Sequence, residues 1–390
     1  MDYTPDNTTN LAVNQMANAP QDNQNSTITQ SPSPAEIYHA NSSPGTPQYH
    51  YGAPQSFFNP QYLEEQRKKM FVRKQHEKNI KLLGTNTGAT LLLVLIFSFA
   101  MSFLLVVPQF SKLYGNNLTF SGAFGIFYSV VSVGVAFLIG LFFFKKSKTL
   151  NKIPFNMPKS NTQPLLLILI GFGGCLIANY ITAILRAFGE GIGIYSNYTA
   201  LEDPSGTLDV VMLFIGSAVI PPLIEEFAIR GVLMQSLRKY GDAFAIITSA
   251  FVFGLFHGNA VQMPFAFLCG LFIGYAVIAT ESLWTGIIIH GLMNAMSVVS
   301  SALIYYFDEY VSNTFFYVGS AVGIVLGVIA LIIYLNKNKF GAPLKKNGVY
   351  NELSIGEKFI KFNTSPLMIF AIILYVVEAI SQLTTTPPTY

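Results

Sequence analysis

The stretch GATLLLVLIFSFAMSFLLVVP at residues 88–108 contains no charged residue. A helix needs about 20 apolar residues to cross the hydrocarbon core of a bilayer, and this stretch meets that length. The whole chain of 390 residues has a similar bias, with 51% hydrophobic and 11% charged residues. A typical soluble domain has roughly 25% charged residues. With a mean hydropathy of +0.45, the sequence predicts an integral membrane protein.

Apolar segments of this kind recur along the chain. We count nine, at 88–108, 120–144, 165–185, 208–237, 243–257, 265–280, 283–307, 315–335 and 366–383. Two of them, 243–257 and 265–280, are shorter than a usual span, so they could cross with a tilt in a thinned bilayer or form a re-entrant pair. The sequence therefore predicts an all-α, polytopic bundle of about nine transmembrane helices.

Composition divides the chain into three parts. Residues 1–62 are rich in Asn, Gln, Ser, Thr and Pro and contain no Lys or Arg, which is typical of a disordered polar tail. Residues 63–87 form a basic juxtamembrane segment that we expect to be helical. Residues 88–386 then form the helical membrane domain.

Positive charges are concentrated in alternate loops. The juxtamembrane segment and the loops 145–164 and 336–365 are rich in Lys. Few positive charges occur in the loops between them, at 109–119, 186–207, 258–264 and 308–314. Because cytoplasmic loops carry an excess of Lys and Arg, this pattern predicts a cytoplasmic N-terminus.

The same composition excludes two classes of protein. The chain has two cysteines, Cys175 and Cys269, and both lie inside apolar segments, so a disulfide framework is excluded. The cations flank apolar segments and form no separate basic domain, so a nucleic-acid-binding protein is also excluded.

Few ionisable side chains lie inside the apolar segments, where they are costly and therefore indicate function. One segment contains PPLIEEFAIRG at 221–231. The next ends in FGLFH at 253–257, and a later one contains HGLMN at 290–294. The last segment contains Glu378, which we interpret as a helix-packing or interface residue.

Spacing indicates how the first two of these motifs can work. Residues four apart share a helix face, whereas adjacent residues diverge by about 100°. Glu226 and Arg230 can therefore form an ion pair, which leaves Glu225 without a partner on its own helix. Phe253 lies on the same face as His257 and can supply an apolar wall or an aromatic contact.

The third motif and two prolines complete the candidate site. His290 and Asn294 share a helix face. Pro221 and Pro222 precede Glu225, and proline removes a backbone donor and kinks a helix. A free carboxylate, two imidazoles and an amide from three helices could hold one water or one metal ion. A buried carboxylate beside neutral imidazoles is suited to act as a general base near neutral pH.

The patterns EExxxR, FxxxH and HxxxN on successive helices resemble the CAAX-protease and bacteriocin-processing (CPBP, or Abi) family of intramembrane proteases. This family includes the type II CAAX prenyl endopeptidases, and the resemblance covers a core at about 208–300. It implies that Glu225 activates water, while His257, His290 and Asn294 hold that water or a metal and stabilise the oxyanion. It also implies supporting roles for the other motif residues, Glu226, Arg230 and Phe253.

Two alternatives stay open for the cofactor. Catalytic zinc usually has three protein ligands and a water, which Glu225, His257 and His290 could supply. A Glu225 that binds zinc could not easily act as the base, however, and the zincin motif HExxH is absent from the sequence. The resemblance is compatible with a metalloprotease and with a glutamate-dependent protease.

We therefore predict an intramembrane endopeptidase that cleaves a membrane-associated protein or peptide, by CAAX-type or bacteriocin-type processing. The alternatives are a non-catalytic immunity or scaffold protein of the same fold, and a transporter with a proton relay. The expected partners are the lipid bilayer and a peptide or a prenylated or lipidated protein, and the expected location is the plasma membrane of a bacterium, or the endoplasmic reticulum of a eukaryote.

Two expectations concern the geometry of the site. We expect the three motifs to converge in a polar cavity open to the cytoplasm. The polar tail and the ninth segment lie outside the family core, and we expect them to leave the site unaffected.

Overall fold

The computed structural model describes residues 60–386 except 149, 197–203, 339–343 and 345–352. Most of the expected polar tail lies outside these residues. The first described helix, α2 (Pro60–Phe103), contains the whole basic juxtamembrane segment and the first apolar segment. Residues 60–62, which we expected to belong to a disordered tail, are therefore helical.

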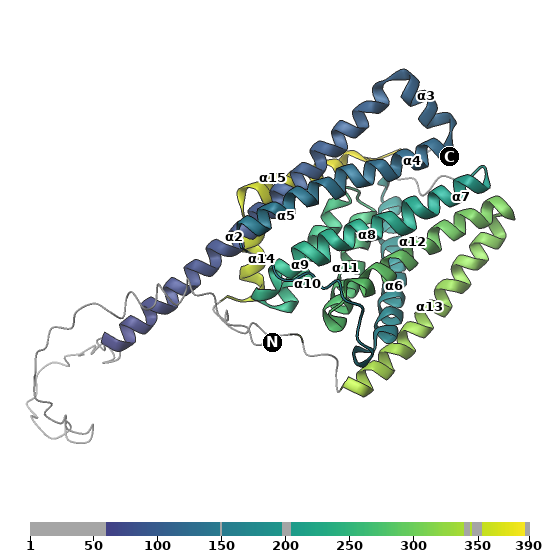
Figure 1. Ribbon diagram of the computed structural model, residues 1–390. Helices are drawn as coiled ribbons and strands as arrows, with labels where there is room; N and C mark the ends of the chain where they lie inside the picture. The colour runs from purple at the N-terminus through teal and green to yellow at the C-terminus, as the bar shows by residue number, and fades with distance from the viewer. Residues whose placement is uncertain (1–59, 149, 197–203, 339–343, 345–352, 387–390) are drawn as a thin grey trace, which may run out of the picture. The chain divides into compact units, whose positions relative to one another are not determined.

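The remaining helices follow in chain order (Figure 1). They are α3 (Pro108–Asn116), α4 (Leu118–Ser129), α5 (Ala136–Lys146), α6 (Pro164–Gly191), α7 (Thr207–Leu213), α8 (Ile220–Glu226), α9 (Met234–Leu237), α10 (Asp242–Phe256), α11 (Gln262–Thr280), α12 (Leu283–Tyr306), α13 (Glu309–Asn338), α14 (Ile355–Asn363) and α15 (Pro366–Ser381). Three π-helical segments continue longer helices: η4 (Val130–Val135), η6 (Phe214–Val219) and η7 (Phe227–Leu233). Three short 3-10 turns are η3 (Leu104–Val106), η5 (Ser160–Thr162) and η8 (Arg238–Tyr240).

The prediction of a polytopic helical bundle is confirmed. All nine apolar segments are helical. In the described part of the chain, seven helices are long and apolar enough to cross a membrane, and eight if the bent pair α14–α15 forms one span. Helix α11 has 19 residues and qualifies, whereas α10 has 15 and does not. The expected number of nine spans stays a prediction.

Contacts across the bundle show which helix ends lie together. At one end, Arg73 on α2 forms an ion pair with Glu357 on α14 at 2.6 Å. The buried Lys358 of α14 donates to the carbonyl oxygen of Tyr240 in η8 at 2.9 Å. The beginning of α2, η8 and α14 therefore share one end, which we call the lysine-rich end.

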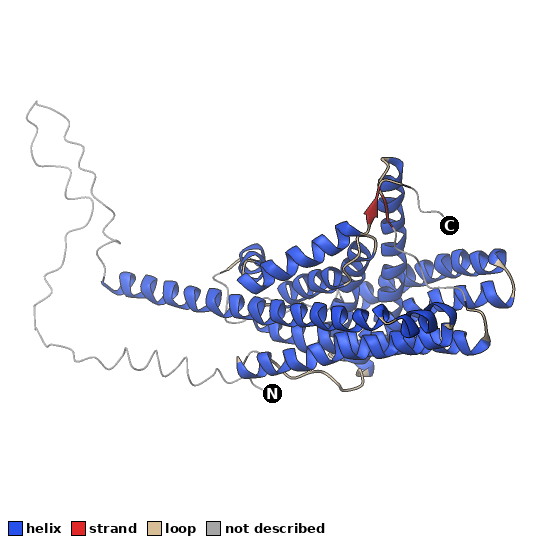
Figure 2. Ribbon diagram, turned by 90° about the horizontal axis from the view of Figure 1, so that it is seen from above, coloured by secondary structure: helices blue, strands red, loops and turns tan. Residues whose placement is uncertain are grey.

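The opposite end is joined in the same way. Thr119 of α4 donates to Asp209 of α7 at 2.6 Å. After α6 and after α15, the short strands β1 (Tyr195–Ser196) and β2 (Leu383–Thr384) pair antiparallel, as Figure 2 shows in red. The last turns of α6 and α15 therefore meet at this second end, which we call the lysine-poor end.

The loop at 150–157 closes the lysine-rich end beneath α12. The backbone N–H of Leu283 donates to the carbonyl oxygen of Pro154 at 2.9 Å. The indole N–H of Trp284 donates to the carbonyl oxygen of Phe155 at 3.1 Å, and the Phe155 ring stacks on Phe227. This loop therefore forms a layer below the first turn of α12.

Helices α6 and α13 cross at glycines. A Cβ atom on Gly173 would lie 3.0 Å from the Cα atom of Gly327. Small residues let the backbones of membrane helices approach closely. This crossing fixes α6 as one wall of the central site.

Candidate active site

The helix that carries the paired glutamates is continuous but lacks two backbone donors at its prolines, Pro221 and Pro222. In a continuous helix the carbonyl oxygen of Ser217 would accept from residue 221 in an α-helical turn or from residue 222 in a π-helical turn. Both are proline and have no N–H. The side-chain amide of Asn294 donates to this oxygen at 2.8 Å instead. The two prolines thus leave the carbonyl oxygen of Ser217 free to accept from Asn294, and this bond attaches α12 to the helix of the paired glutamates.

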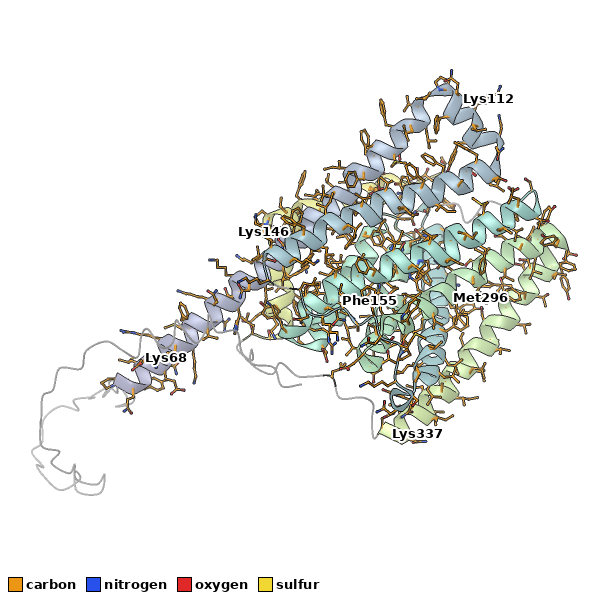
Figure 3. The ribbon with its side chains drawn as sticks, viewed as in Figure 1. Lys68, Lys112, Lys146, Phe155, Met296 and Lys337 are labelled. Carbon is orange, nitrogen blue, oxygen red and sulfur yellow. The ribbon has the colours of Figure 1, made fainter. Side chains whose placement is uncertain are left out.

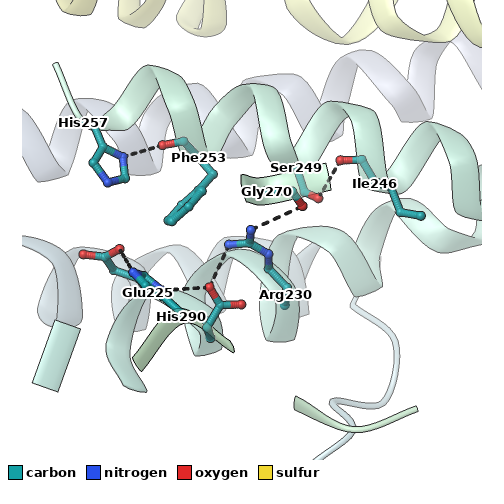
Figure 4. A network of polar contacts seen from close by, with 9 residues as sticks. Glu225, Arg230, Ile246, Ser249, Phe253, His257, Gly270 and His290 are labelled. Atoms are coloured by element: carbon teal, nitrogen blue, oxygen red, sulfur yellow. Dashed lines mark hydrogen bonds and ion pairs between the residues drawn. The ribbon is translucent and has the colours of Figure 1, made fainter. Parts of the chain in front are cut away.

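Glu226 lies behind the site and organises it. Its Oε1 atom accepts from Arg230 Nη1 at 3.0 Å and from His290 Nδ1 at 3.1 Å. The Glu226 and Arg230 side chains are both 0% exposed, so the predicted ion pair is confirmed as a buried one. Because His290 Nδ1 is directed at Glu226, the other ring nitrogen, Nε2, is directed at Glu225 (Figure 4).

Of the paired glutamates, Glu225 is the one that makes no side-chain hydrogen bond to another described residue. Its Oε2 atom is buried and has no hydrogen-bond partner among the described residues. The nearest basic group is His290 Nε2 at 3.9 Å, which is too long for a hydrogen bond. We expected a distance within about 10 Å for one shared site, and the structure confirms it.

His257 is held in one tautomer by its own helix. Its Nδ1 atom lies 2.7 Å from the carbonyl oxygen of Phe253. A carbonyl oxygen only accepts, so Nδ1 carries the hydrogen and Nε2 of the neutral ring is an acceptor. The predicted contact with Phe253 is confirmed, because the two rings meet edge to face at 4.9 Å.

Phe253 links the two imidazoles to the buried arginine. Its ring lies 5.6 Å from the His290 ring, nearly perpendicular to it. On the same ring, the Arg230 guanidinium carbon lies 4.3 Å from the centroid, which is a cation–π contact. Figure 4 shows Phe253 between His257 and Arg230. This ring therefore fixes the spacing of three helices.

One cavity of about 570 Å³ brings the predicted catalytic residues together. Glu225, His257, His290 and Asn294 all line it, together with Phe253. The predicted convergence of the three motifs is therefore confirmed. Glu226 and Arg230 do not line the cavity and support it from behind.

Sequence reasoning missed the contribution of α6. Asn179 and Thr182 line the cavity, as do the two cysteines, Cys175 on α6 and Cys269 on α11. The signal was present, because residues 175, 179 and 182 recur at intervals of four and three on an otherwise apolar helix.

The ninth segment, which we expected to leave the site unaffected, contacts the turn that follows His257. Gln382, one residue after α15, donates to the carbonyl oxygen of Gly258 at 2.9 Å. It also accepts from the side-chain amide of Asn259 at 2.5 Å. Glu378 faces the same turn, since a Cβ atom on Gly258 would lie 2.8 Å from its Oε2. The C-terminal helix therefore braces the turn that follows His257.

The arrangement does not present a ready zinc site. Within the described residues, no three His, Cys, Asp or Glu side chains are grouped so that they could hold one metal ion. Glu225, His257 and His290 line the same cavity but do not form such a group. Zinc binding stays a prediction.

The fold and the site define a polytopic helical membrane protein with a buried glutamate–histidine centre. Residues 207–296 match the family model described as type II CAAX prenyl endopeptidase Rce1-like. This match supports a protease of the CPBP family and confirms the resemblance carried by the three motifs. The comparisons found no matching curated protein and no matching solved structure.

Proposed function

We propose that the protein is an intramembrane endopeptidase that hydrolyses a peptide bond of a membrane-associated protein or peptide with water activated by Glu225. One observation carries the proposal. Glu225 Oε2 is a buried carboxylate oxygen without a hydrogen-bond partner among the described residues, and it lies in a cavity with His257, His290 and Asn294. A carboxylate held in this way can accept a proton from a water in the cavity.

The first half of the reaction uses Glu225 and His257. Glu225 takes a proton from the water, and the water oxygen attacks the peptide carbonyl carbon. His257 Nε2 accepts the second hydrogen of the same water and orients it, because Nδ1 is bonded to its own helix. Glu225 then gives its proton to the leaving amine, and the peptide C–N bond breaks.

The second half concerns the charge that develops on the carbonyl oxygen. Asn294 uses one amide hydrogen on Ser217, and its second amide hydrogen can donate to the oxyanion. His290 Nε2 can donate as well when both ring nitrogens carry a hydrogen. Donors fixed before the reaction are the main source of oxyanion stabilisation. Glu226 fixes the His290 ring from the opposite side.

The proposal is tested by replacing Glu225 with Gln in the full-length protein. Peptides of the membrane fraction are compared by mass spectrometry between cells that carry wild-type and Glu225→Gln protein. We expect wild-type-dependent cleavage products to fall by about 10²–10⁴-fold, the usual contribution of a general base.

Glu378→Gln is the matched control, because it removes a carboxylate near the site that does not line the cavity. It should retain most of the products. Full cleavage by Glu225→Gln would overturn the assignment of the base. A cellular phenotype that persists in Glu225→Ala, with no cleavage products in wild-type cells, would favour the non-catalytic immunity or scaffold protein.

A further inference from the structure

The two ends of the bundle differ strongly in charge. Within the described residues, the only Lys and Arg in the segments of the lysine-poor end are Lys112 and Arg186, and Arg230 is buried between the ends. Figure 3 shows Lys68, Lys146 and Lys337 toward one end of the bundle and Lys112 at the other. Cytoplasmic loops are the ones enriched in Lys and Arg. This charge pattern places the lysine-rich end in the cytoplasm.

The cavity extends from the middle of the bundle to the lysine-poor end. On α6 its lining ends at Arg186, in the last turns before Gly191. On α11 it includes Gln262, the first residue of the helix. Among the lining residues, Arg186 and Ser297 are exposed, whereas Cys175 at the inner part is buried. Exposure of the lining thus increases toward the lysine-poor end.

In the opposite direction the cavity is closed by packed side chains. Glu226 and Arg230 are fully buried below Glu225, and Leu233 and Leu237 follow on the same helix with 0% exposure. Beyond them the loop at 150–157 covers the start of α12. No residue of this loop lines the cavity.

We infer that the reactive cavity opens to the non-cytoplasmic face of the membrane, and that its substrate is a peptide segment presented at that outer face. The substrate part of this inference rests on the proposed function. The direction of the opening does not, because it follows from the helix ends, the burial and the charges. It differs from our expectation of a cavity open to the cytoplasm.

The shape and chemistry of the cavity suit an extended peptide. A volume of about 570 Å³ is within the usual range for ligand sites. The α6 wall offers polar side chains along its length, from Asn179 through Thr182 to Arg186. Arg186 is paired with Glu190 at 2.8 Å, so the mouth is not a strong site for a free anion. A neutral backbone with polar groups fits this wall better than a charged headgroup.

The test measures from which side a thiol in the cavity can be reached. The two native cysteines line the cavity, so both are first replaced by Ala. Ser297→Cys then places a single thiol on the exposed part of the lining. Lys112→Cys and Lys148→Cys, made separately in the same background, mark the lysine-poor and the lysine-rich end. Intact cells are treated with a charged, membrane-impermeant methanethiosulfonate, and the remaining thiols are counted after permeabilisation.

We expect Ser297→Cys and Lys112→Cys to react in intact cells and Lys148→Cys to react only after permeabilisation. Reaction of Ser297→Cys only after permeabilisation, together with Lys148→Cys, would overturn the inference. No reaction of Ser297→Cys on either side would also overturn it, since the cavity would then be closed. Reaction of Lys148→Cys in intact cells would overturn the assigned orientation. Elution as a single species in detergent checks that each variant is folded.

A further measurement separates this inference from the proposed function. Labelling needs no catalysis, so Ser297→Cys should react to the same extent when Glu225→Gln is added. If cleavage is also observed, the impermeant reagent should abolish it in intact cells with Ser297→Cys and leave it unchanged with Lys112→Cys. Labelling of Ser297→Cys from outside without any cleavage would support the outward opening of the cavity and contradict the proposed protease activity. Cleavage that survives full modification of Ser297→Cys would reject the outer route of the substrate.

Discussion

Gln382 donates to the carbonyl oxygen of Gly258, the residue that directly follows His257. The contact joins the C-terminal helix to the motif FxxxH, which lies more than a hundred residues earlier in the chain. The turn after His257 thus depends on a residue outside the matched core at 207–296.

Loss of this brace should slow the reaction. Gln382→Ala removes the bond to Gly258 and the acceptor for Asn259. We expect a decrease in cleavage on the order of tenfold, which corresponds to about one net hydrogen bond. Ser381→Ala is the control, because among the described residues its hydroxyl bonds only to the carbonyl oxygen of Glu378 in its own helix. Equal activity of both variants would show that His257 does not depend on the brace.

The ion pairs Glu226–Arg230 and Arg186–Glu190 should differ in their effect on stability. Glu226→Ala leaves Arg230 as a fully buried, uncompensated cation, and we expect about 3–5 kcal/mol of destabilisation. The pair Arg186–Glu190 has the same residue types and the same spacing of four residues but is exposed, so Glu190→Ala should cost about 0.2–1 kcal/mol. Thermal unfolding in detergent measures both. Similar losses would contradict the buried role of Glu226.

Ser217 and Asn294 allow a test of how the prolines build the site. Asn294→Ala leaves the Ser217 carbonyl without its observed donor, which should cost about 1–3 kcal/mol. Pro221→Ala restores a backbone N–H four residues after Ser217. The double variant should therefore recover stability without recovering activity. Strictly additive losses in unfolding experiments would show that the two residues are not coupled.

Two glycines with positive φ allow the cost of backbone strain to be measured separately from the cost of side-chain crowding. Gly258 has φ +57 and would meet Glu378 at 2.8 Å, whereas Gly193 has φ +81 and open space around it. Alanine at either position should cost about 1–2 kcal/mol from the left-handed backbone. Only Gly258→Ala should also lower cleavage, since the added methyl group displaces the turn after His257. Normal cleavage by Gly258→Ala at a reduced unfolding temperature would contradict this.

Local helix periodicity was sufficient to predict part of the site. The spacing of four residues predicted both the Glu226–Arg230 pair and the Phe253–His257 contact, and both are observed. Both lie within a single helical segment, where side-chain geometry is set by the turn. The prolines predicted a kink before Glu225, but the two π-helical segments around it, η6 and η7, could not be predicted from composition.

Contacts between distant segments could not be predicted in this way. Counted along the sequence from the lysine-rich ends of their helices, Glu225 and His290 differ in depth by about 10 Å at a rise of 1.5 Å per residue. In the structure the two side chains nevertheless lie 3.9 Å apart, and the start of α12 at Leu283 is bonded to the loop at 150–157. An irregular loop has no sequence periodicity, so its position against α12 could not be predicted. The brace from Gln382 was missed for a similar reason, since it depends on tertiary packing alone.

The pairing of Tyr195 with Thr384 and of Ser196 with Leu383 has a mechanical consequence. One strand continues from the helix that walls the cavity, and the other follows the residue that steadies His257. An outward movement of α6 to admit a bulky peptide would therefore have to break the hydrogen bonds between β1 and β2. We therefore expect this pairing to couple the width of the cavity mouth to the position of the His257 ring.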